Sequence, residues 1–274
     1  MTEVLTPTEE LPKVYGRTET WRLLVPQTLI QTKRLLMRWW RDPLTVVQSL
    51  VFPALLLIVL NTVLGKQISE FSEVSALYGF VPMSALVGVM SGSVAGAITL
   101  GRERDEGLLA RFWVLPVHRA SGLVARIVAE GIRIVLCTAV MFAVGVALGF
   151  RFKQGLLAGI ALFAVPLLFG IAFATVVTAV AVFSAKAALV EAVSLGSSLM
   201  MFFSTGFVLL VAYPPWAQPI VQHQPMSYAI DAMKGLSVGG PVRDPLLATI
   251  AWCIGALVVF AIPAAVGYRR ASRT

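Results

Sequence analysis

The chain of 274 residues contains six apolar segments that are each long enough to cross a lipid bilayer. A helix needs about 20 apolar residues to span the hydrocarbon layer. Only 13% of the residues are charged, against about 25% in soluble proteins. The sequence therefore predicts an all-α polytopic membrane protein with six transmembrane helices, at about 44–64, 77–100, 122–150, 155–183, 189–212 and 246–267.

Two segments precede the first span. Residues 1–20 are polar and contain two prolines, which predicts a flexible tail. Residues 21–42 place arginines on one helical face and leucine and tryptophan on another, which favours an amphipathic helix in the plane of the lipid headgroups. The alternative is a flanking segment that only precedes the first span, but such a segment would not require separate basic and apolar faces. The interfacial helix is defined by Arg34, Arg38, Trp39, Trp40 and Arg41.

A charged stretch lies between the second and third spans. Because charge is costly in hydrocarbon, this stretch must lie in water or against another protein. Residues 102–116 are expected to form a short amphipathic helix that ends at Pro116, which lacks an N–H donor. A solvated loop would not need the exposed aromatic residues Phe112 and Trp113. These residues therefore favour binding of the stretch in a groove on a partner protein.

The distribution of positive charge predicts the orientation of the chain. Lys and Arg are enriched in cytoplasmic loops of membrane proteins. If the N-terminus is cytoplasmic, the outer loops hold only five of the 22 Lys and Arg residues: Lys66, Arg151, Lys153, Lys234 and Arg243. We therefore expect a multi-pass protein of the cell membrane with both termini in the cytoplasm. The net charge of +8 indicates contacts with anionic lipids rather than with nucleic acid.

The second span carries a repeated small-residue motif made by Gly88, Gly92 and Gly96. Small residues allow another helix to approach closely in a membrane. The motif fits packing within one subunit and an interface between subunits equally well.

The sequence offers little chemistry of its own. Gly65-Lys66 lacks the first glycine of a phosphate-binding loop, and Cys137 and Cys253 have no metal-ligand spacing. No catalytic or metal-binding residue is therefore predicted. Glu130 and Glu191 are expected near the cytoplasmic edge, whereas an ion-driven transporter would bury acids at the bilayer centre.

Two other functions stay open. His223 and Asp231 could form an acid–base pair in an outward-facing membrane enzyme that acts on a lipid-linked substrate. A lone histidine beside prolines is more often a packing or capping residue. A channel or scaffold subunit without pumping activity is the other alternative.

Together these features resemble an ABC-2 type exporter permease, which has the type V exporter fold. The resemblance covers about residues 21–270. The coupling pattern of that family matches Glu103-Arg104, Gly107-Leu108-Leu109 and Leu115-Pro116, and its outer pattern matches Pro215-Trp216 and Pro225-Met226-Ser227-Tyr228. Residues 108–122 and 267–272 are similar to the daunorubicin/doxorubicin-resistance-type permeases of mycobacteria.

The resemblance implies a domain layout. Residues 43–268 form a six-helix transmembrane domain, and residues 269–274 form the cytoplasmic C-terminus. The Pro-rich segment 213–245 forms re-entrant helices on the outer face, with Pro215, Trp216, Pro225 and Tyr228 at an extracellular gate. The coupling helix at 102–116 receives force from an ATPase through Glu103, Arg104, Gly107, Leu108, Leu109, Arg111, Phe112, Leu115 and Pro116.

The resemblance also implies the partners and the cargo. ATP and Mg²⁺ are bound by a separate ATPase subunit in two copies, and this chain binds no cofactor. A second permease, either a different chain or a second copy, completes the transporter. The cargo is an apolar lipid similar to phthiocerol dimycocerosate, or an amphipathic drug. The acidic pair Asp105-Glu106 departs from the usual family pattern and is expected to affect which ATPase docks.

Overall fold

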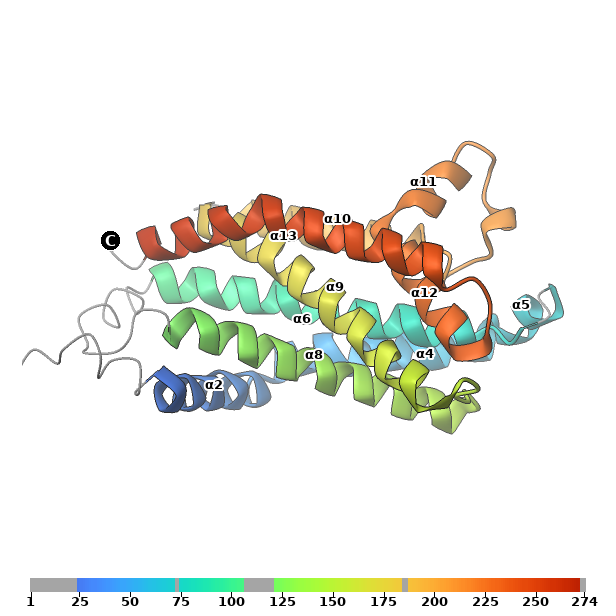
Figure 1. Cartoon of the computed structure of the whole chain (residues 1–274), viewed down its shortest axis with the longest axis horizontal. Coiled ribbons are helices and arrows are strands. Elements are labelled where there is room, and N and C mark those ends of the chain that lie inside the picture. The colour runs from blue at the N-terminus through green and yellow to red at the C-terminus, as the bar shows by residue number, and fades with distance from the viewer. Residues whose placement is uncertain (1–23, 72–73, 106–120, 184–186, 272–274) are drawn as a thin grey trace, which may run out of the picture.

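The computed structural model describes residues 24–71, 74–105, 121–183 and 187–271, and this part of the chain contains helices, turns and no strand (Figure 1). The predicted tail at 1–20 lies outside it. The elements are α2 (Leu24–Arg41), α3 (Pro43–Val46), the π-helical turn η1 (Val47–Val51), α4 (Phe52–Val63), α5 (Gly65–Phe71), α6 (Leu77–Asp105), α8 (Ser121–Leu148), α9 (Gly155–Phe183), α10 (Ala187–Phe202), η2 (Leu210–Ala212), α11 (Gln218–His223), α12 (Pro225–Val238) and α13 (Arg243–Ala271).

The long helices are those of a polytopic membrane protein, as the sequence predicted. Five segments of the described chain are long and apolar enough to cross a bilayer, and Leu189–Phe202 is a shorter apolar helix. The five are Pro43–Val63, Leu77–Glu103, Val124–Leu148, Gly155–Val182 and Arg243–Gly267. They run along the long axis of the molecule (Figure 1). We name its two ends after the helices found there, the α2 end and the α12 end.

Helix α6 lies at the centre of the bundle and packs against α4, α8, α9, α10 and α12. Many of its apolar side chains, among them Phe80, Met83, Leu86 and Met90, are almost completely buried. Serine and glycine between them let the neighbouring helices approach closely. The core of the molecule is therefore built around this helix.

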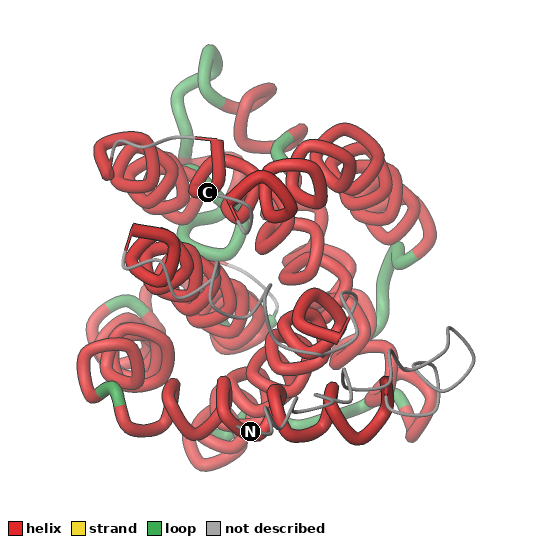
Figure 2. Tube along the Cα trace, turned by 90° about the vertical axis from the view of Figure 1, so that its left-hand side faces the viewer, coloured by secondary structure: helices red, strands yellow, loops and turns green. Residues whose placement is uncertain are grey.

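Helix α2 is inclined to the long helices and lies along one side of the bundle at its end (Figures 1 and 2). It packs against α8 through a face that contains the buried Thr28 and Thr32. Gln31 donates a hydrogen bond to Ser121, and Thr32 donates one to the carbonyl oxygen of Ala125. Polar contacts hold α2 in place, whereas much of its apolar surface is exposed.

The first span contains an irregular turn next to Pro53, which we call the bend at Pro53. The π-helical turn η1 immediately precedes α4, and Pro53 cannot donate to the carbonyl oxygen of Ser49. A Cβ added to Gly88 would lie 2.8 Å from that oxygen. The glycine thus lets α6 approach the bend.

The later spans differ from local expectation in two ways. A proline inside a helix usually breaks or kinks it, yet α9 is continuous from Gly155 to Phe183 through Pro166. The fifth span ends at Phe202 and not near residue 212. Beyond it the chain passes close to α6 at Gly206, whose added Cβ would lie 2.8 Å from the Cβ of Met83. Composition alone does not reveal this close approach.

The early end of α10 is stabilised by side chains that bind its last carbonyl groups. The hydroxyl of Tyr213 donates to the carbonyl oxygen of Phe202 at 2.7 Å. The side-chain amide of Gln224 donates to the carbonyl oxygen of Met200 at 3.1 Å and also to the carbonyl oxygen of Phe203. A helix end in an apolar environment needs such partners.

Replacing Tyr213 with phenylalanine is expected to lower stability by about 1 kcal/mol, because the carbonyl of Phe202 loses a hydrogen-bond donor. In a chain of this size that corresponds to a fall of about 2–4 °C in the melting temperature. Thermal unfolding of the purified protein in detergent measures it. An unchanged melting temperature would show that water replaces the hydroxyl.

The predicted re-entrant segment forms two short helices, α11 and α12. Helix α12 packs against α6, α9 and α13, and nine of its 14 residues are buried. It is therefore part of the core at the α12 end and not a surface loop (Figure 1).

Candidate functional site

A buried carboxylate joins three helices at the α2 end. Glu103 lies near the C-terminal end of α6 and is 4% exposed. Its two oxygens accept from Arg38 of α2 at 2.6 Å and from Arg126 of α8 at 2.7 Å. We call these three residues the Glu103 cluster. It holds α2, α6 and α8 together at the point where the predicted coupling stretch begins.

A second ion pair lies deeper in the bundle, between Glu130 and Arg133 of α8. The Nη2 of Arg133 also donates to Ser93 at 3.1 Å and to the carbonyl oxygen of Val89 at 3.3 Å. Ser93 in turn donates to Glu130 at 2.6 Å. This network ties α8 to the middle of α6.

Arg133 of this pair lies well inside the apolar part of α8. Arg133 is 4% exposed and follows Val124, where the apolar part of α8 begins, by nine residues, or about 13 Å. Arg126, Glu130 and Arg133 are spaced to share one face of α8, but they do not form a continuous ladder of ion pairs, because Arg126 pairs with Glu103 and Arg133 is buried.

The three glycines of α6 have three different surroundings. An added Cβ would lie 2.8 Å from the carbonyl oxygen of Ser49 at Gly88 and 1.5 Å from Nη1 of Arg133 at Gly92. At Gly96 it would meet no atom of the described chain within 4 Å. Gly88 and Gly92 thus accommodate parts of the same subunit, whereas Gly96 borders open space.

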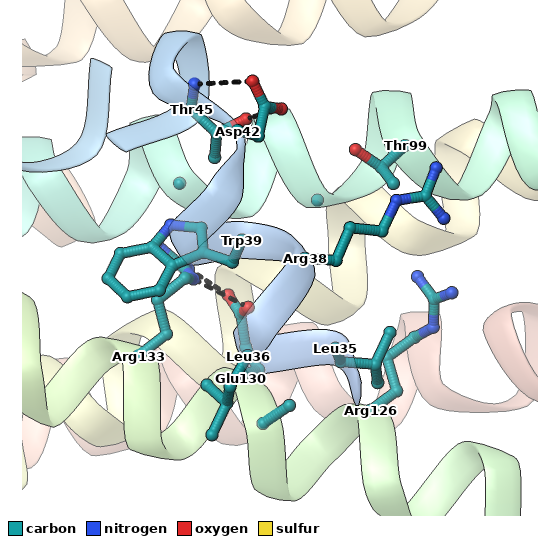
Figure 3. Close-up of a pocket in the computed structure, with 13 residues that line it drawn as sticks. Leu35, Leu36, Arg38, Trp39, Asp42, Thr45, Thr99, Arg126, Glu130 and Arg133 are labelled. Atoms are coloured by element: carbon teal, nitrogen blue, oxygen red, sulfur yellow. Dashed lines mark hydrogen bonds and ion pairs between the residues drawn. The ribbon is translucent and has the colours of Figure 1, made fainter. Parts of the chain in front are cut away.

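A cavity of about 110 Å³ lies between α2, α6 and α8 (Figure 3). We call it the α2 cavity. In Figure 3 the guanidinium groups of Arg38 and Arg126 extend to the same side, and Glu130 and Arg133 point toward each other beside the Trp39 ring. Its lining combines apolar side chains with polar ones, three of them arginines: Leu35, Leu36, Arg38, Trp39, Asp42, Thr45, Gly92, Gly96, Thr99, Arg126, Ala129, Glu130 and Arg133.

A larger cavity of about 370 Å³ lies between α6, α8, α9 and α13. We call it the inner cavity. Gly96, Arg126 and Glu130 line both cavities, so the two meet at these residues. Small apolar side chains make up most of the remaining wall: Ala97, Ile127, Ile171, Ala174, Leu257, Ala261, Ala264 and Ala265.

Most predicted coupling residues lie outside the described chain. Gly107, Leu108, Leu109, Arg111, Phe112, Leu115 and Pro116 are among them. Residues 102–105, which include Arg104, belong to the end of α6 and not to a separate helix. Of this set, Glu103 is the one whose contacts are described, and it is bound within its own subunit.

The predicted gate residues lie at the α12 end, on and around the short helices. Trp216 is 70% exposed, and Pro225 is the first residue of α12. Tyr228 packs edge-on against His223, with ring centres 6.3 Å apart. The structure thus brings Tyr228 next to His223, while Trp216 projects from the surface.

The acid–base pair considered for an enzyme is not assembled. His223 bonds through Nδ1 to the carbonyl oxygen of Pro219, and Asp231 accepts from Thr205 at 2.9 Å. Burial raises the pKa of Asp231. The described residues also contain no cluster of three His, Cys, Asp or Glu side chains that could hold a metal ion. His223 and Asp231 therefore do not form the acid–base pair that the sequence left open.

Comparison with known proteins identifies the family of the chain. The family model for the ABC-2 type transporter matches residues 26–236. The chain belongs to the ABC-2 type transporter family. It is 52% identical, over 92% of its length and 91% of theirs, to the proteins named probable doxorubicin resistance ABC transporter permease protein DrrC from two strains of Mycobacterium tuberculosis, CDC 1551 / Oshkosh and ATCC 25618 / H37Rv. A daunorubicin resistance ABC transporter permease protein, DrrB1 of Streptomyces coeruleorubidus, is 26% identical over 78% of this chain and 76% of that protein.

Sequence reasoning found the charged residues of this ABC-2 permease but not their partners. Glu103 was assigned to a partner protein, and its two arginines are 65 and 23 residues away in sequence. Gly92 was predicted only as a small packing residue. The available signal was the presence of three charged residues at the start of an otherwise apolar span.

Proposed function

We propose that this ABC-2 permease is the membrane subunit of an ATP-driven exporter. It works with two copies of an ATPase subunit and with a second permease, either DrrB-like or a second copy of itself. The sequence contains no phosphate-binding loop, so ATP and Mg²⁺ are bound by the partner. The relatives are named as ABC transporter permeases, which supports this assignment.

The Glu103 cluster is the observation that carries the proposal. It lies at the start of the coupling stretch 102–116 and connects α6 to both α2 and α8. A force applied to that stretch therefore acts on three helices at once. Bistable packing of helices can amplify small shifts of this kind into opening and closing.

The cargo is an apolar lipid similar to phthiocerol dimycocerosate, or an amphipathic drug, moved from the inner leaflet outward. The names of the relatives, doxorubicin and daunorubicin resistance permeases, support the drug. The proposal of a lipid cargo is based on the sequence resemblance to the mycobacterial permeases. Entry from the side, beside α2 and the bend at Pro53, suits a molecule that partitions into the bilayer. The segment 213–245 gates its release.

The two alternatives predict different outcomes. A membrane enzyme would lose activity on substitution of His223 and would not need an ATPase. A channel or scaffold subunit would not alter ATP hydrolysis. An ATPase gene beside the gene of this chain would favour the exporter.

Replacing Leu109 with aspartate is expected to reduce capture of the ATPase and stimulation of its ATP hydrolysis by tenfold or more, since a charge then lies in an apolar contact. The measurement is co-purification and ATPase activity in lipid nanodiscs with both permeases present. Phe71→Asp is the matched control, because Phe71 is 86% exposed on α5 at the other end. Equal losses in both variants would contradict the proposed coupling role.

A further inference from the structure

The α2 cavity contains more positive than negative groups in its ion-pair networks. Arg38, Arg126 and Arg133 bond to two carboxylates, Glu103 and Glu130. The third acid, Asp42, caps α3 by accepting from the hydroxyl and the N–H of Thr45, and it interacts electrostatically with Arg102. The region thus holds four arginines and three carboxylates. Arg38 and Arg102 are exposed to solvent, whereas Arg133 is buried. Excess positive charge beside a buried guanidinium favours binding of an anion.

One guanidinium nitrogen in this cavity lacks a partner. Arg133 is only 4% exposed, and its Nη1 has no hydrogen-bond acceptor within the described chain. The indole N–H of Trp39, on the same cavity wall, is likewise buried and unbonded among the described residues. Buried donors normally have partners. Two unused donors beside an empty volume point to an acceptor-rich ligand.

The inner cavity provides room for an apolar group next to these donors. Its volume of about 370 Å³ lies within the range of sites that hold drug-sized molecules, about 300–1,000 Å³. Its wall is mostly alanine, isoleucine and leucine, and its charged residues are the two that it shares with the α2 cavity, Arg126 and Glu130. A ligand placed across the junction would have its polar end among arginines and its apolar end among alanines.

We propose that the two cavities form one binding site, within a single subunit, for a membrane lipid with an anionic phosphate headgroup. The phosphate lies in the α2 cavity and accepts from Arg38, Arg126 or Arg133, because guanidinium groups match phosphate geometry. One acyl chain lies in the inner cavity. A cationic amphiphile is excluded, because Glu130 is already bound by Arg133 and Ser93. This assignment is independent of the transported cargo.

Gly96 is where the proposal can be tested without disturbing the fold. It lines both cavities, and a Cβ there meets nothing within 4 Å in the described chain. Gly96→Leu therefore fills the junction. Gly255→Leu is the matched control, since Gly255 is exposed on α13 and its Cβ also has open space. Both variants add the same side chain to a helix.

The experiment measures lipid binding to the purified full chain in neutral detergent by native mass spectrometry. The probes are dioleoyl phosphatidylglycerol, dioleoylglycerol, which has the same chains without phosphate, and inorganic phosphate. We expect one tightly bound phosphatidylglycerol per subunit, at least tenfold weaker binding in Gly96→Leu, and unchanged binding in Gly255→Leu. Arg126→Gln is expected to weaken binding of phosphatidylglycerol and leave that of dioleoylglycerol as it was.

Three results would overturn the proposal. Unchanged binding in Gly96→Leu would mean that the lipid lies elsewhere on the surface. Equal affinity for dioleoylglycerol would show that the phosphate is not recognised. Displacement of the lipid by inorganic phosphate at equal concentration would leave a site for a free anion without an acyl chain.

Discussion

Replacing Gly92 with alanine is expected to destabilise the α2 end of the bundle by about 3 kcal/mol or more. The new methyl group would lie 1.5 Å from Nη1 and 2.5 Å from Cζ of Arg133. A side-chain end can usually move aside, but this guanidinium is buried and bonded to Glu130, Ser93 and the carbonyl oxygen of Val89. Its displacement would leave a carboxylate without its cation in an apolar environment.

The measurement is the melting temperature of the detergent-purified protein, which should fall by about 6 °C or more. Gly96→Ala is the control one helical turn away, because its Cβ has open space. Alanine is the better helix former by about 1 kcal/mol, so this control should not lose stability. Similar melting temperatures for both variants would show that Arg133 has another position available.

The transmembrane architecture could be predicted because hydropathy reports directly on helices that lie in lipid. The start of α9 at Gly155 and the amphipathic helix α2 both follow from local sequence. The end of α10 at Phe202 does not, because it depends on Tyr213 and Gln224 binding the last carbonyl groups. A helix end of this kind is set by residues beyond the helix.

The candidate site was less predictable for the same reason. Residues 102–116 stand out by charge, which suggested for all of them an amphipathic helix outside the membrane that binds a partner protein. The structure instead buries Glu103 between Arg38 and Arg126, which come from two other helices. Likewise, the motif of three glycines suggested close helix packing, within one subunit or between subunits, for all three, while Gly88, Gly92 and Gly96 face a backbone carbonyl group, a guanidinium and a cavity. The spacing of residues within one helix cannot identify which groups of neighbouring helices they contact.

Replacing Glu103 with glutamine is expected to release α2 from the bundle and to abolish coupled transport. The two hydrogen bonds to guanidinium groups join charged partners, and each is worth about 1.5–3 kcal/mol where it is shielded from water. Arg126 is 22% exposed and Arg38 is 48% exposed, so the contribution of Arg38 is reduced by solvent. We therefore expect the loss of stability to decrease in the order Glu103→Gln, Arg126→Gln, Arg38→Gln.

A double-mutant cycle tests whether the cluster acts as a unit. Once Glu103 is replaced by glutamine, Arg126→Gln should lower the free energy of unfolding only slightly further, because the guanidinium has already lost its anion. Additive losses would mean that the two residues act separately. A cysteine at position 29, where Leu29 is 61% exposed on α2, reports whether the helix has moved, through its rate of labelling from the aqueous phase. If transport is lost while that rate and the melting temperature stay the same, Glu103 acts on the partner protein and not through α2. If all three change together, the ion pairs that hold α2 to α6 and α8 are what the coupling stretch needs to move the membrane helices.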